Sequence, residues 1–319
     1  MVFSENTLRM QPLVSVIVCL YNAKGTLSRC LDSVLAQSLK DIEIIIVDDG
    51  STDGSELLTE TYAASDSRIS VIHQPNRGIA AARQCGIDKA SGKYTIHVDA
   101  DDWAEPGMLE ELTACALSTG ADMVFCDYIE ENEAGVFYRR QQPCSDDSRK
   151  VLQQMLVGLH GSLWNKLILR DLYSQSGTRF VKGLNFCEDE SVIIRLLSYG
   201  CKVGYVERAF YHYDKNSNAA SYTNRWNSRT AEEYELFIQS CEPCLGDPQC
   251  RRNLDNRIAG IIKKLTYAPE GRYASCKAFY LRHRASLRRS SLSLSRKIYC
   301  WLYYNGFPGV RKFGKANQD

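Results

Sequence analysis

The sequence predicts an α/β fold in which a mainly parallel sheet is covered by helices on both faces. Short apolar runs rich in β-branched residues alternate with segments whose apolar residues recur at helical spacing. Each connection is long enough to hold the helix that joins two parallel strands. With 319 residues, 44% hydrophobic and 24% charged, the chain suits one large or two modest domains and is neither disordered nor fibrous.

The expected strands share a short, buried, apolar pattern. They lie at residues 13–20, 42–47, 69–72, 94–98 and 121–126. The expected helices between them repeat apolar or alanine positions every three or four residues. They lie at residues 26–38, 55–64, 79–90 and 108–118. Residues 130–150 are polar, which predicts a loop or a pair of exposed strands.

The pattern changes to helices and short strands after residue 151. Helices are expected at 229–240 and 254–267, and the serine-rich stretch 286–295 is a candidate hinge. We therefore expect an α/β domain at residues 1–215 and a helical extension at 216–319.

A net charge of +1 hides a marked asymmetry. Residues 272–319 hold 11 Lys or Arg and one acid, which leaves 28 basic and 37 acidic residues elsewhere. No nucleic-acid partner is expected, whereas the basic tail favours an anionic one. No apolar run reaches the ~18 residues of a transmembrane helix, and no signal peptide precedes the first strand, so a cytoplasmic location is expected.

The basic tail also carries large apolar residues, among them Leu294, Ile298 and Trp301. This mixture, over residues of about 277–319, is typical of a helix lying on an anionic membrane surface. Two alternatives stay open: a basic face packed on the acidic domain, and a helix that contacts another protein.

The 13 cysteines are expected to be free thiols in a reducing cytoplasm. Several lie within apolar strand or helix patterns, where a thiol acts as a small hydrophobic group. Cys241, Cys244, Cys250 and Cys276 form a candidate zinc set. Their second pair lacks the usual CxxC spacing, so zinc is the less favoured interpretation.

Polar clusters follow three of the expected strands. These clusters are Tyr21-Asn22, Asp48-Asp49 and Asp99-Ala100-Asp101-Asp102. Because ligands bind at the carboxyl ends of parallel strands, the clusters are expected to line one crevice. Three carboxylates in four residues need water or a cation, and Mg²⁺ or Mn²⁺ with phosphate oxygens would suit them. The alternative is a solvated acidic turn that caps the next helix.

Other residues in this crevice suit a nucleotide. The Asp48 carboxylate can accept a hydrogen bond from a base or a ribose, and the Tyr21 ring can stack on a base. Asn22 is a candidate for pinning the loop, while Asp53 or Ser55 is expected to cap the following helix. Arg83 either neutralises a diphosphate or is an exposed helix residue.

These motifs resemble family 2 glycosyltransferases with the GT-A fold. The resemblance spans roughly residues 13–195 and rests on the order and spacing of its motifs. The matching stretches are VSVIVCLYNAKGTLSRCLDSVLAQS, IEIIIVDDGSTDGS, NRGIAAARQCGIDKASGKYTIHVDADDW, LWNKLILRDLY and FCEDES. A GT-A-like, Rossmann-type sheet with a helical C-terminal extension is therefore expected.

The resemblance implies a nucleotide-diphospho-sugar donor, usually a UDP-sugar. It assigns Tyr21 and Asp48 to the base. It assigns Asp99, beside Ala100, to the ribose. It assigns Asp101 to a Mn²⁺ or Mg²⁺ ion that bridges the diphosphate, and it places Asp102 next to the donor sugar.

The acceptor hydroxyl needs a base near its proton. The resemblance places that base at Asp189, with Glu188 supporting it, and direct attack on the anomeric carbon gives inversion. The alternative is that these acids favour a helix N-terminus.

Trp164 and Lys166 resemble the acceptor-side WNK stretch of the family, although both also suit packing and surface charge. His212 falls where related enzymes place a residue near the diphosphate, so it is a candidate metal contact. Asp214 stands where an Arg often follows, which weakens that assignment.

We therefore expect an inverting, metal-dependent hexosyl- or N-acetylhexosaminyltransferase. It would act on a glycan or lipid-linked acceptor in surface-polysaccharide synthesis, at the inner face of the membrane. A non-catalytic sugar-nucleotide-binding protein is the first alternative. A sugar nucleotidyltransferase is less favoured because residues 21–25 make a poor phosphate loop. The absence of GxGxxG excludes a nicotinamide dehydrogenase.

Overall fold

The computed structural model describes residues 11–216, 230–268 and 273–307. The chain forms two compact units that interleave along the sequence, and each is described by itself. The first, the sheet unit, comprises Met1–Pro143, Ser162–Phe180 and Cys201–Asn218. The second, the helical unit, comprises Cys144–Gly161, Val181–Gly200 and Ala219–Asp319. The boundary at residue 215 stays a prediction.

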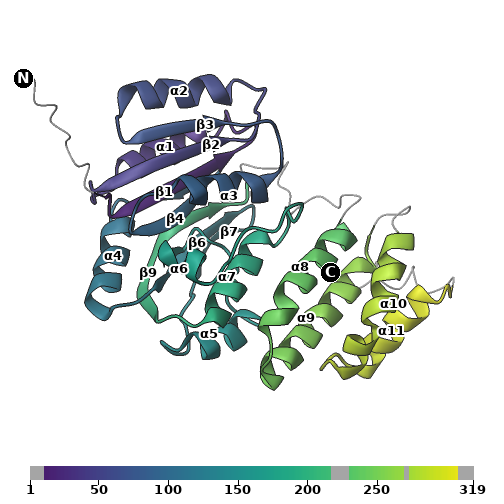
Figure 1. Cartoon of the computed structure of the whole chain (residues 1–319). Coiled ribbons are helices and arrows are strands. Elements are labelled where there is room, and N and C mark those ends of the chain that lie inside the picture. The colour runs from purple at the N-terminus through teal and green to yellow at the C-terminus, as the bar shows by residue number, and fades with distance from the viewer. Residues whose placement is uncertain (1–10, 217–229, 269–272, 308–319) are drawn as a thin grey trace, which may run out of the picture. The chain divides into compact units, whose positions relative to one another are not determined.

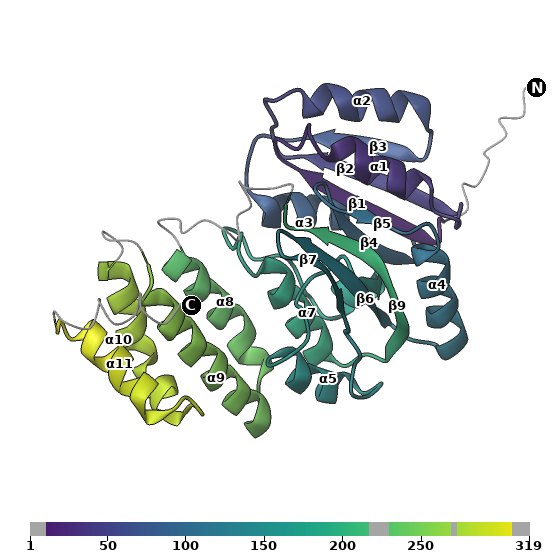
Figure 2. The same cartoon turned by 180° about the vertical axis from the view of Figure 1, so that it is seen from behind.

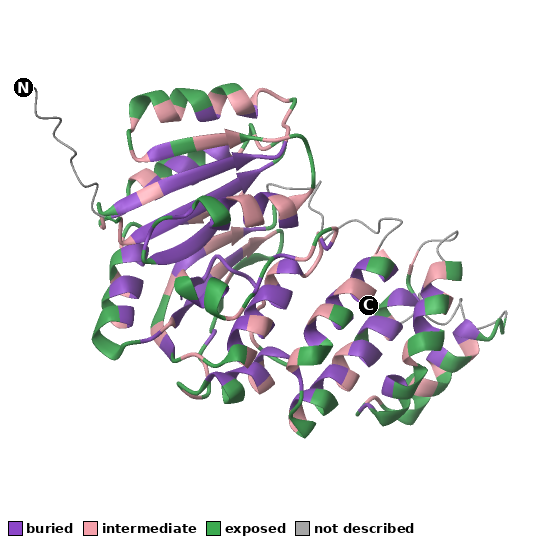
Figure 3. Ribbon diagram, viewed as in Figure 1, coloured by how far each residue is buried: buried purple, intermediate pink, exposed green. Residues whose placement is uncertain are grey.

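Four parallel strands form the first half of the sheet, in the order β3-β2-β1-β4 (Figure 1). They are β1 Val14–Leu20, β2 Ile42–Asp48, β3 Ile69–His73 and β4 Tyr94–Asp99. Their bounds agree with the expected strands to within a residue or two. Buried β-branched residues fill β1 and β2, which explains why the apolar pattern alone located them (Figure 3).

The second half of the sheet is mixed. Among the described residues the order continues β4-β8-β6-β9-β5, with β7 paired to the outer part of β6. These strands are β5 Trp103–Ala104, β6 Met123–Asn132, β7 Gly135–Arg139, β8 Lys166–Leu169 and β9 Val203–Asp214. β6 contains most of the strand expected at 121–126 and continues to Asn132. Its end pairs with the mostly exposed β7, within the stretch 130–150 where a loop or a pair of exposed strands was expected, and the helix α5, Ser148–Met155, follows.

Helices cover both faces of the sheet, as the alternating pattern predicts (Figures 1 and 2). These helices are α1 Leu27–Leu35, α2 Ser55–Ser65, α3 Ile79–Lys89 and α4 Met108–Thr119. α1 and α4 pack with Val14 and Val16 in the main apolar core. α3 packs on the opposite face, where a Cβ on Gly86 would lie 2.4 Å from Cγ2 of Ile17. A glycine is therefore needed for this close approach.

The helices after residue 185 belong mainly to the helical unit. They are α7 Glu188–Tyr199, α8 Thr230–Cys241, α9 Pro248–Leu265, α10 Tyr273–Arg289 and α11 Leu294–Tyr304; a short α6, Asp171–Gln175, lies in the sheet unit. The two expected helices correspond to α8 and α9. Within the described ranges, no helix is both long and apolar enough to span a membrane.

Candidate active site

The polar strand ends meet at one edge of the sheet. In the parallel registers, Leu20 of β1 pairs with Asp48 of β2, and Cys19 pairs with Asp99 of β4. Tyr21 directly follows Leu20 and its side chain is 53% exposed, whereas Asp48 is only 2% exposed. The three polar clusters therefore lie side by side, as the predicted sheet requires.

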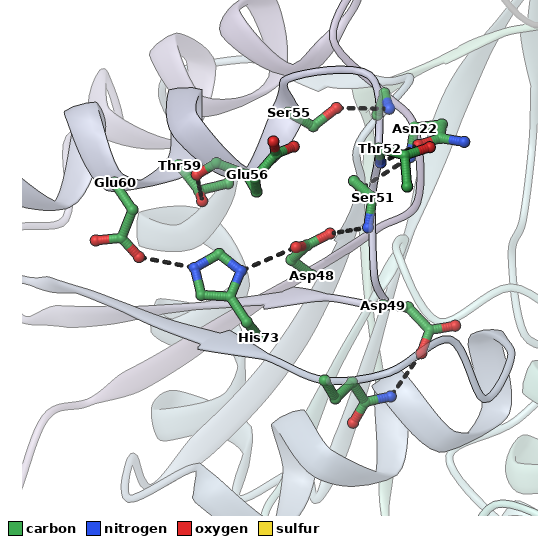
Figure 4. Close-up of polar contacts among 12 residues, drawn as sticks. Asn22, Asp48, Asp49, Ser51, Thr52, Ser55, Glu56, Thr59, Glu60 and His73 are labelled. Carbon is green, nitrogen blue, oxygen red and sulfur yellow. Dashed lines mark hydrogen bonds and ion pairs between the residues drawn. The ribbon is translucent and has the colours of Figure 1, made fainter.

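Hydrogen bonds join the loop after β1 to the loop after β2 (Figure 4). Asn22 has a left-handed backbone, with φ of 54°, and its Oδ1 accepts from the Thr52 N–H at 2.8 Å. The Asn22 N–H donates to the Ser51 hydroxyl at 2.9 Å. Asp53 accepts from the Lys24 N–H at 3.0 Å. Asn22 therefore pins this loop, as expected.

Asp48 is held from two sides (Figure 4). The Ser51 N–H donates to its Oδ1 at 2.9 Å, and Nδ1 of His73 contacts its Oδ2 at 2.9 Å. Nε2 of His73 contacts Oε1 of Glu60 at 2.8 Å. Hydrogen bonds to Asp48 and then Glu60 raise the pKa of His73. Sequence reasoning missed His73, because its role depends on the β2–β3 register.

Asp49 organises the loop that enters α3. Its Oδ1 accepts from the Arg77 N–H at 2.9 Å and from the Gln74 side chain at 2.7 Å, and its Oδ2 accepts from the Gly78 N–H at 2.8 Å. This carboxylate thus satisfies backbone donors that precede the helix. Of the two adjacent aspartates, Asp49 accepts hydrogen bonds from the loop before α3, and Asp48 contacts His73.

Arg83 lies on α3 and is 5% exposed. Its Nη2 donates to Oδ1 of Asp99 at 2.8 Å, and the Asp99 N–H donates to the Tyr211 hydroxyl at 3.0 Å. Arg83 is therefore a buried residue turned toward Asp99 at the end of β4 rather than an exposed helix residue. Its predicted contact with a diphosphate stays a prediction.

Asp102 is fully buried and ties the acidic cluster to β9. Its Oδ2 accepts from the Tyr211 hydroxyl at 2.8 Å, and its Oδ1 accepts from the Asp214 N–H at 2.9 Å. Burial, followed by the charges of Asp101 and Asp99, raises the pKa of Asp102 well above its usual range. Its predicted place beside the donor sugar stays a prediction.

Arg29 on α1 braces the same cluster. Its Nη2 donates to the main-chain oxygen of Asp101 at 2.6 Å, and its Nη1 contacts Oδ2 of Asp214 at 2.8 Å. The Asp101 side chain is partly exposed, and the neighbouring Ala100 is buried. Sequence reasoning missed Arg29 and Tyr211, because both reach Asp99, Asp101 and Asp102 only through contacts between distant parts of the chain.

Trp164 and Lys166 are both buried in the sheet unit. The Trp164 ring stacks on that of Tyr211, with centroids 4.3 Å apart. Nζ of Lys166 donates to the Ser162 main-chain oxygen at 2.6 Å and to Oδ1 of Asn165 at 2.7 Å. Trp164 packs in the sheet unit as the alternative expected, whereas Lys166 is fully buried and hydrogen-bonded, so it is not a surface charge. The predicted contact of both residues with the acceptor stays a prediction.

His212 lies on β9 opposite β5. Its Nδ1 contacts Glu131 at 2.7 Å and its Nε2 contacts Glu105 at 3.2 Å. Its ring also stacks on Trp103 with centroids 3.5 Å apart. Both nitrogens already have carboxylate partners, and the proposed metal contact stays a prediction.

Glu188 and Asp189 begin α7 in the helical unit. The residue before them, Cys187, has a left-handed backbone with φ of 64°. Oδ1 of Asp189 accepts from the Glu190 N–H at 2.7 Å, and Oε2 of Glu190 contacts Arg257 at 2.5 Å. Glu188 is buried, whereas Asp189 is partly exposed. The role of this pair as base stays a prediction.

All 13 cysteines are free, as expected. Across the described residues, no group of three or more His, Cys, Asp or Glu side chains is placed to hold a metal alone. Cys241, Cys244, Cys250 and Cys276 all lie in described segments, and they form no such group.

The fold and the site together define a GT-A-like α/β enzyme. The family description "Glycosyl transferase family 2" matches residues 15–177. The glycosyltransferase EpsJ of Bacillus subtilis, described as uncharacterized, is 34% identical over 272 residues, 78% of each chain. The putative glycosyltransferase EpsH of the same organism is 35% identical over 211 residues, 63% of this chain and 60% of its own. This chain therefore belongs to glycosyltransferase family 2 and is a glycosyltransferase.

Solved structures support the same fold. Residues 1–349 of Staphylococcus aureus TarS in complex with UDP-GlcNAc superpose with a TM-score of 0.75 at 17% identity, covering 96% of this chain and 92% of that one. The mannosyltransferase PcManGT of Pyrobaculum calidifontis, in complex with GDP-Man and Mn²⁺, gives a TM-score of 0.51 at 16% identity. Here the coverage is 96% of this chain and 84% of that one. At these identities the likeness concerns the fold.

Proposed function

We propose that this enzyme transfers a hexosyl or N-acetylhexosaminyl group from a nucleotide-diphospho-sugar, with UDP as the favoured nucleotide. The acceptor would be a hydroxyl of a glycan or lipid-linked glycan in surface-polysaccharide synthesis. The observation that carries this proposal is the register that brings the ends of β2, β1 and β4 together. Solved structures of similar fold, in complex with UDP-GlcNAc or with GDP-Man and Mn²⁺, support it.

The strand ends offer each part of a nucleotide a suitable group. The exposed Tyr21 ring can stack on the base, and the Asp48 carboxylate keeps lone pairs for a base N–H beside its two protein partners. We assign Asp99, with Ala100 next to it, to the ribose. Arg83 holds Asp99 and brings positive charge to the same edge.

We assign a divalent cation to the partly exposed carboxylate of Asp101. Mg²⁺ and Mn²⁺ prefer oxygen ligands, and such ions are often bound by one or two carboxylates together with substrate phosphates. Within the described parts of the chain, no group of three or more His, Cys, Asp or Glu side chains could hold the ion alone. In this proposal, phosphate oxygens of the donor complete its coordination. When bound, the ion would neutralise charge on the leaving group. Asp101 is its proposed ligand, and His212 is a second candidate.

Transfer also needs a base for the acceptor hydroxyl. We assign this role to Asp189, which is partly exposed at the start of α7, with Glu188 beside it. Direct attack of the acceptor on the anomeric carbon inverts its configuration, so no covalent glycosyl-enzyme is required. Asp102, Trp164 and Lys166 are assigned to the sugar and acceptor side.

The proposed donor site is tested with UDP-, GDP- and dTDP-sugars and Mn²⁺. One donor should raise the melting temperature by several degrees, because a ligand at 100 times its Kd stabilises the fold by about 2.7 kcal/mol. The same donor should be hydrolysed slowly in the presence of Mn²⁺. If none of the nucleotides with metal stabilises the protein, the proposal is wrong.

We further propose that the α10–α11 pair docks on an anionic membrane. α11 buries Cys300, Tyr303 and Tyr304, whereas Leu294, Ile298 and Trp301 are 73%, 47% and 49% exposed. The spacing of these three residues places them on one face of the helix. Exposed Arg284, Arg288 and Arg296 on α10 and α11 supply the complementary charge.

A triple variant, in which Leu294, Ile298 and Trp301 are all replaced by serine, should lose binding to vesicles that contain phosphatidylglycerol. The wild type should sediment with these vesicles at low salt and less with neutral phosphatidylcholine, because each basic residue contributes about 1 kcal/mol near an anionic surface. The control is Leu57→Ser, which removes a 69% exposed leucine from α2. Equal sedimentation of the triple variant would refute membrane docking. If the wild type forms a dimer in solution and the triple variant is monomeric, this face of α11 binds a second copy of the chain instead of a membrane.

A further inference from the structure

His73 ends β3 between two carboxylates from different elements. Its Nδ1 lies 2.9 Å from Oδ2 of Asp48, the last residue of β2, and its Nε2 lies 2.8 Å from Oε1 of Glu60 on α2 (Figure 4). The His73 ring therefore joins β2, which ends at the proposed nucleotide site, to α2. The family resemblance assigns nothing to this histidine.

The geometry determines the charge that the ring must carry. A neutral imidazole has a single N–H, so it can donate to one of the two carboxylates and must face the other with a lone pair. Only the imidazolium donates from both nitrogens. The raised pKa of His73 agrees with this assignment. The two contacts at 2.9 and 2.8 Å can both be hydrogen bonds from the ring only when His73 is protonated.

The charged residues on the elements that pack against β3 are acidic. β2 carries Asp48 and, at its other end, Glu43, which bonds Ser15. α2 carries Glu60 and, one turn earlier, Glu56, whose Oε2 is buried without a hydrogen-bond partner among the described residues. These acids favour the imidazolium over the neutral ring.

We propose that His73 is a positioning residue that couples nucleotide binding to pH by holding Asp48 in place for the base. This inference rests on the proposed function of the site. When His73 loses its proton, it keeps a single N–H and no charge, so the charge-assisted bond to Oδ2 of Asp48 is weakened or lost. Nucleotide affinity is therefore full below the pKa of His73 and falls as the pH rises through it.

The test measures UDP binding with Mg²⁺ by calorimetry between about pH 6 and about pH 9. Near pH 6 the wild type should bind UDP about tenfold more tightly than His73→Gln does. Near pH 9 the ratio of the two affinities should approach one. Ionisation of UDP is common to both proteins and cancels in this ratio. His73→Lys, which keeps a positive charge, should retain much of the affinity near pH 9.

A second measurement needs no nucleotide. The NMR titration of the His73 ring should give a pKa above the usual value in the wild type and a lower one in Glu60→Gln. The exposed Glu133→Gln, in the β6–β7 turn, is the matched charge control and should leave the pKa of His73 unchanged. An ordinary pKa in the wild type would overturn the inference.

The two proposals fail in different ways. If UDP binds with the same pH dependence in the wild type and in His73→Gln, the role of His73 is refuted and the nucleotide site stands. If neither UDP nor another nucleotide binds the wild type at any pH, the proposed function fails and the role of His73 fails with it.

Discussion

Replacing Asp101 with alanine is expected to lower kcat/KM for sugar transfer by about 10²–10³-fold, a loss comparable to that of one preorganised group that stabilises developing charge. Asp101 is the proposed protein ligand for the cation that neutralises the leaving diphosphate. Its side chain is partly exposed, and the bond from Arg29 goes to its main-chain oxygen, which the substitution keeps. The melting temperature should therefore change little. Initial rates at several Mn²⁺ concentrations give the measurement.

The control for this experiment is Asp41→Ala. Asp41 is an exposed aspartate directly before β2, at the opposite end of that strand from Asp48. This variant should keep wild-type activity. Nucleotide binding by Asp101→Ala should also lose its enhancement by Mn²⁺. Full metal-dependent turnover in Asp101→Ala would show that Asp101 is not the metal ligand.

The parallel half of the fold was predictable because each of its strands is a short run rich in β-branched apolar residues. β1 and β2 are buried along almost their whole length, so no other element type fits their sequences. The mixed half was harder. β8 has four residues and β5 has two, and their pairing is decided by contacts far along the chain, such as Trp103 with His212. Local patterns carry no information about such pairings.

One boundary was missed although the sequence carries a signal for it. α9 begins at Pro248, and the Asp247 side chain accepts from the N–H groups of Gln249 and Cys250. An aspartate followed by proline is a common start of a helix. The apolar pattern, which placed this helix at 254–267, begins only at Leu254.

Some residues of the candidate site were likewise predictable from the sequence, and others were not. Tyr21, Asp48 and Asp99 were predictable because each lies at or directly after the end of a buried strand. Arg29 and Tyr211 were not, because each reaches the acidic cluster through tertiary packing. The three carboxylates also differ in environment: Asp99 pairs with Arg83, Asp102 is buried with Tyr211, and Asp101 is partly exposed. Sequence alone does not distinguish them.

Replacing Asp189 with asparagine is expected to reduce kcat by about 10²–10⁴-fold, the usual contribution of a positioned general base, while the Kd for the donor changes little. The amide cannot take the proton of the acceptor hydroxyl. Its oxygen can still accept from the Glu190 N–H, so the start of α7 is preserved. Turnover with saturating donor and donor binding, measured separately, test the two parts of this expectation.

The alternative is that Asp189 only favours the N-terminus of α7, and Asp171→Asn separates the two possibilities. Asp171 is likewise an aspartate in the first turn of a helix, and its side chain is 62% exposed. If both acids serve only their helices, both variants should lose about 0.3–1 kcal/mol of stability and keep their turnover. If Asp189 is the base, only its variant loses turnover, and the residual rate loses the dependence on pH that a titrating base imposes. Normal kcat in Asp189→Asn would exclude it as the base.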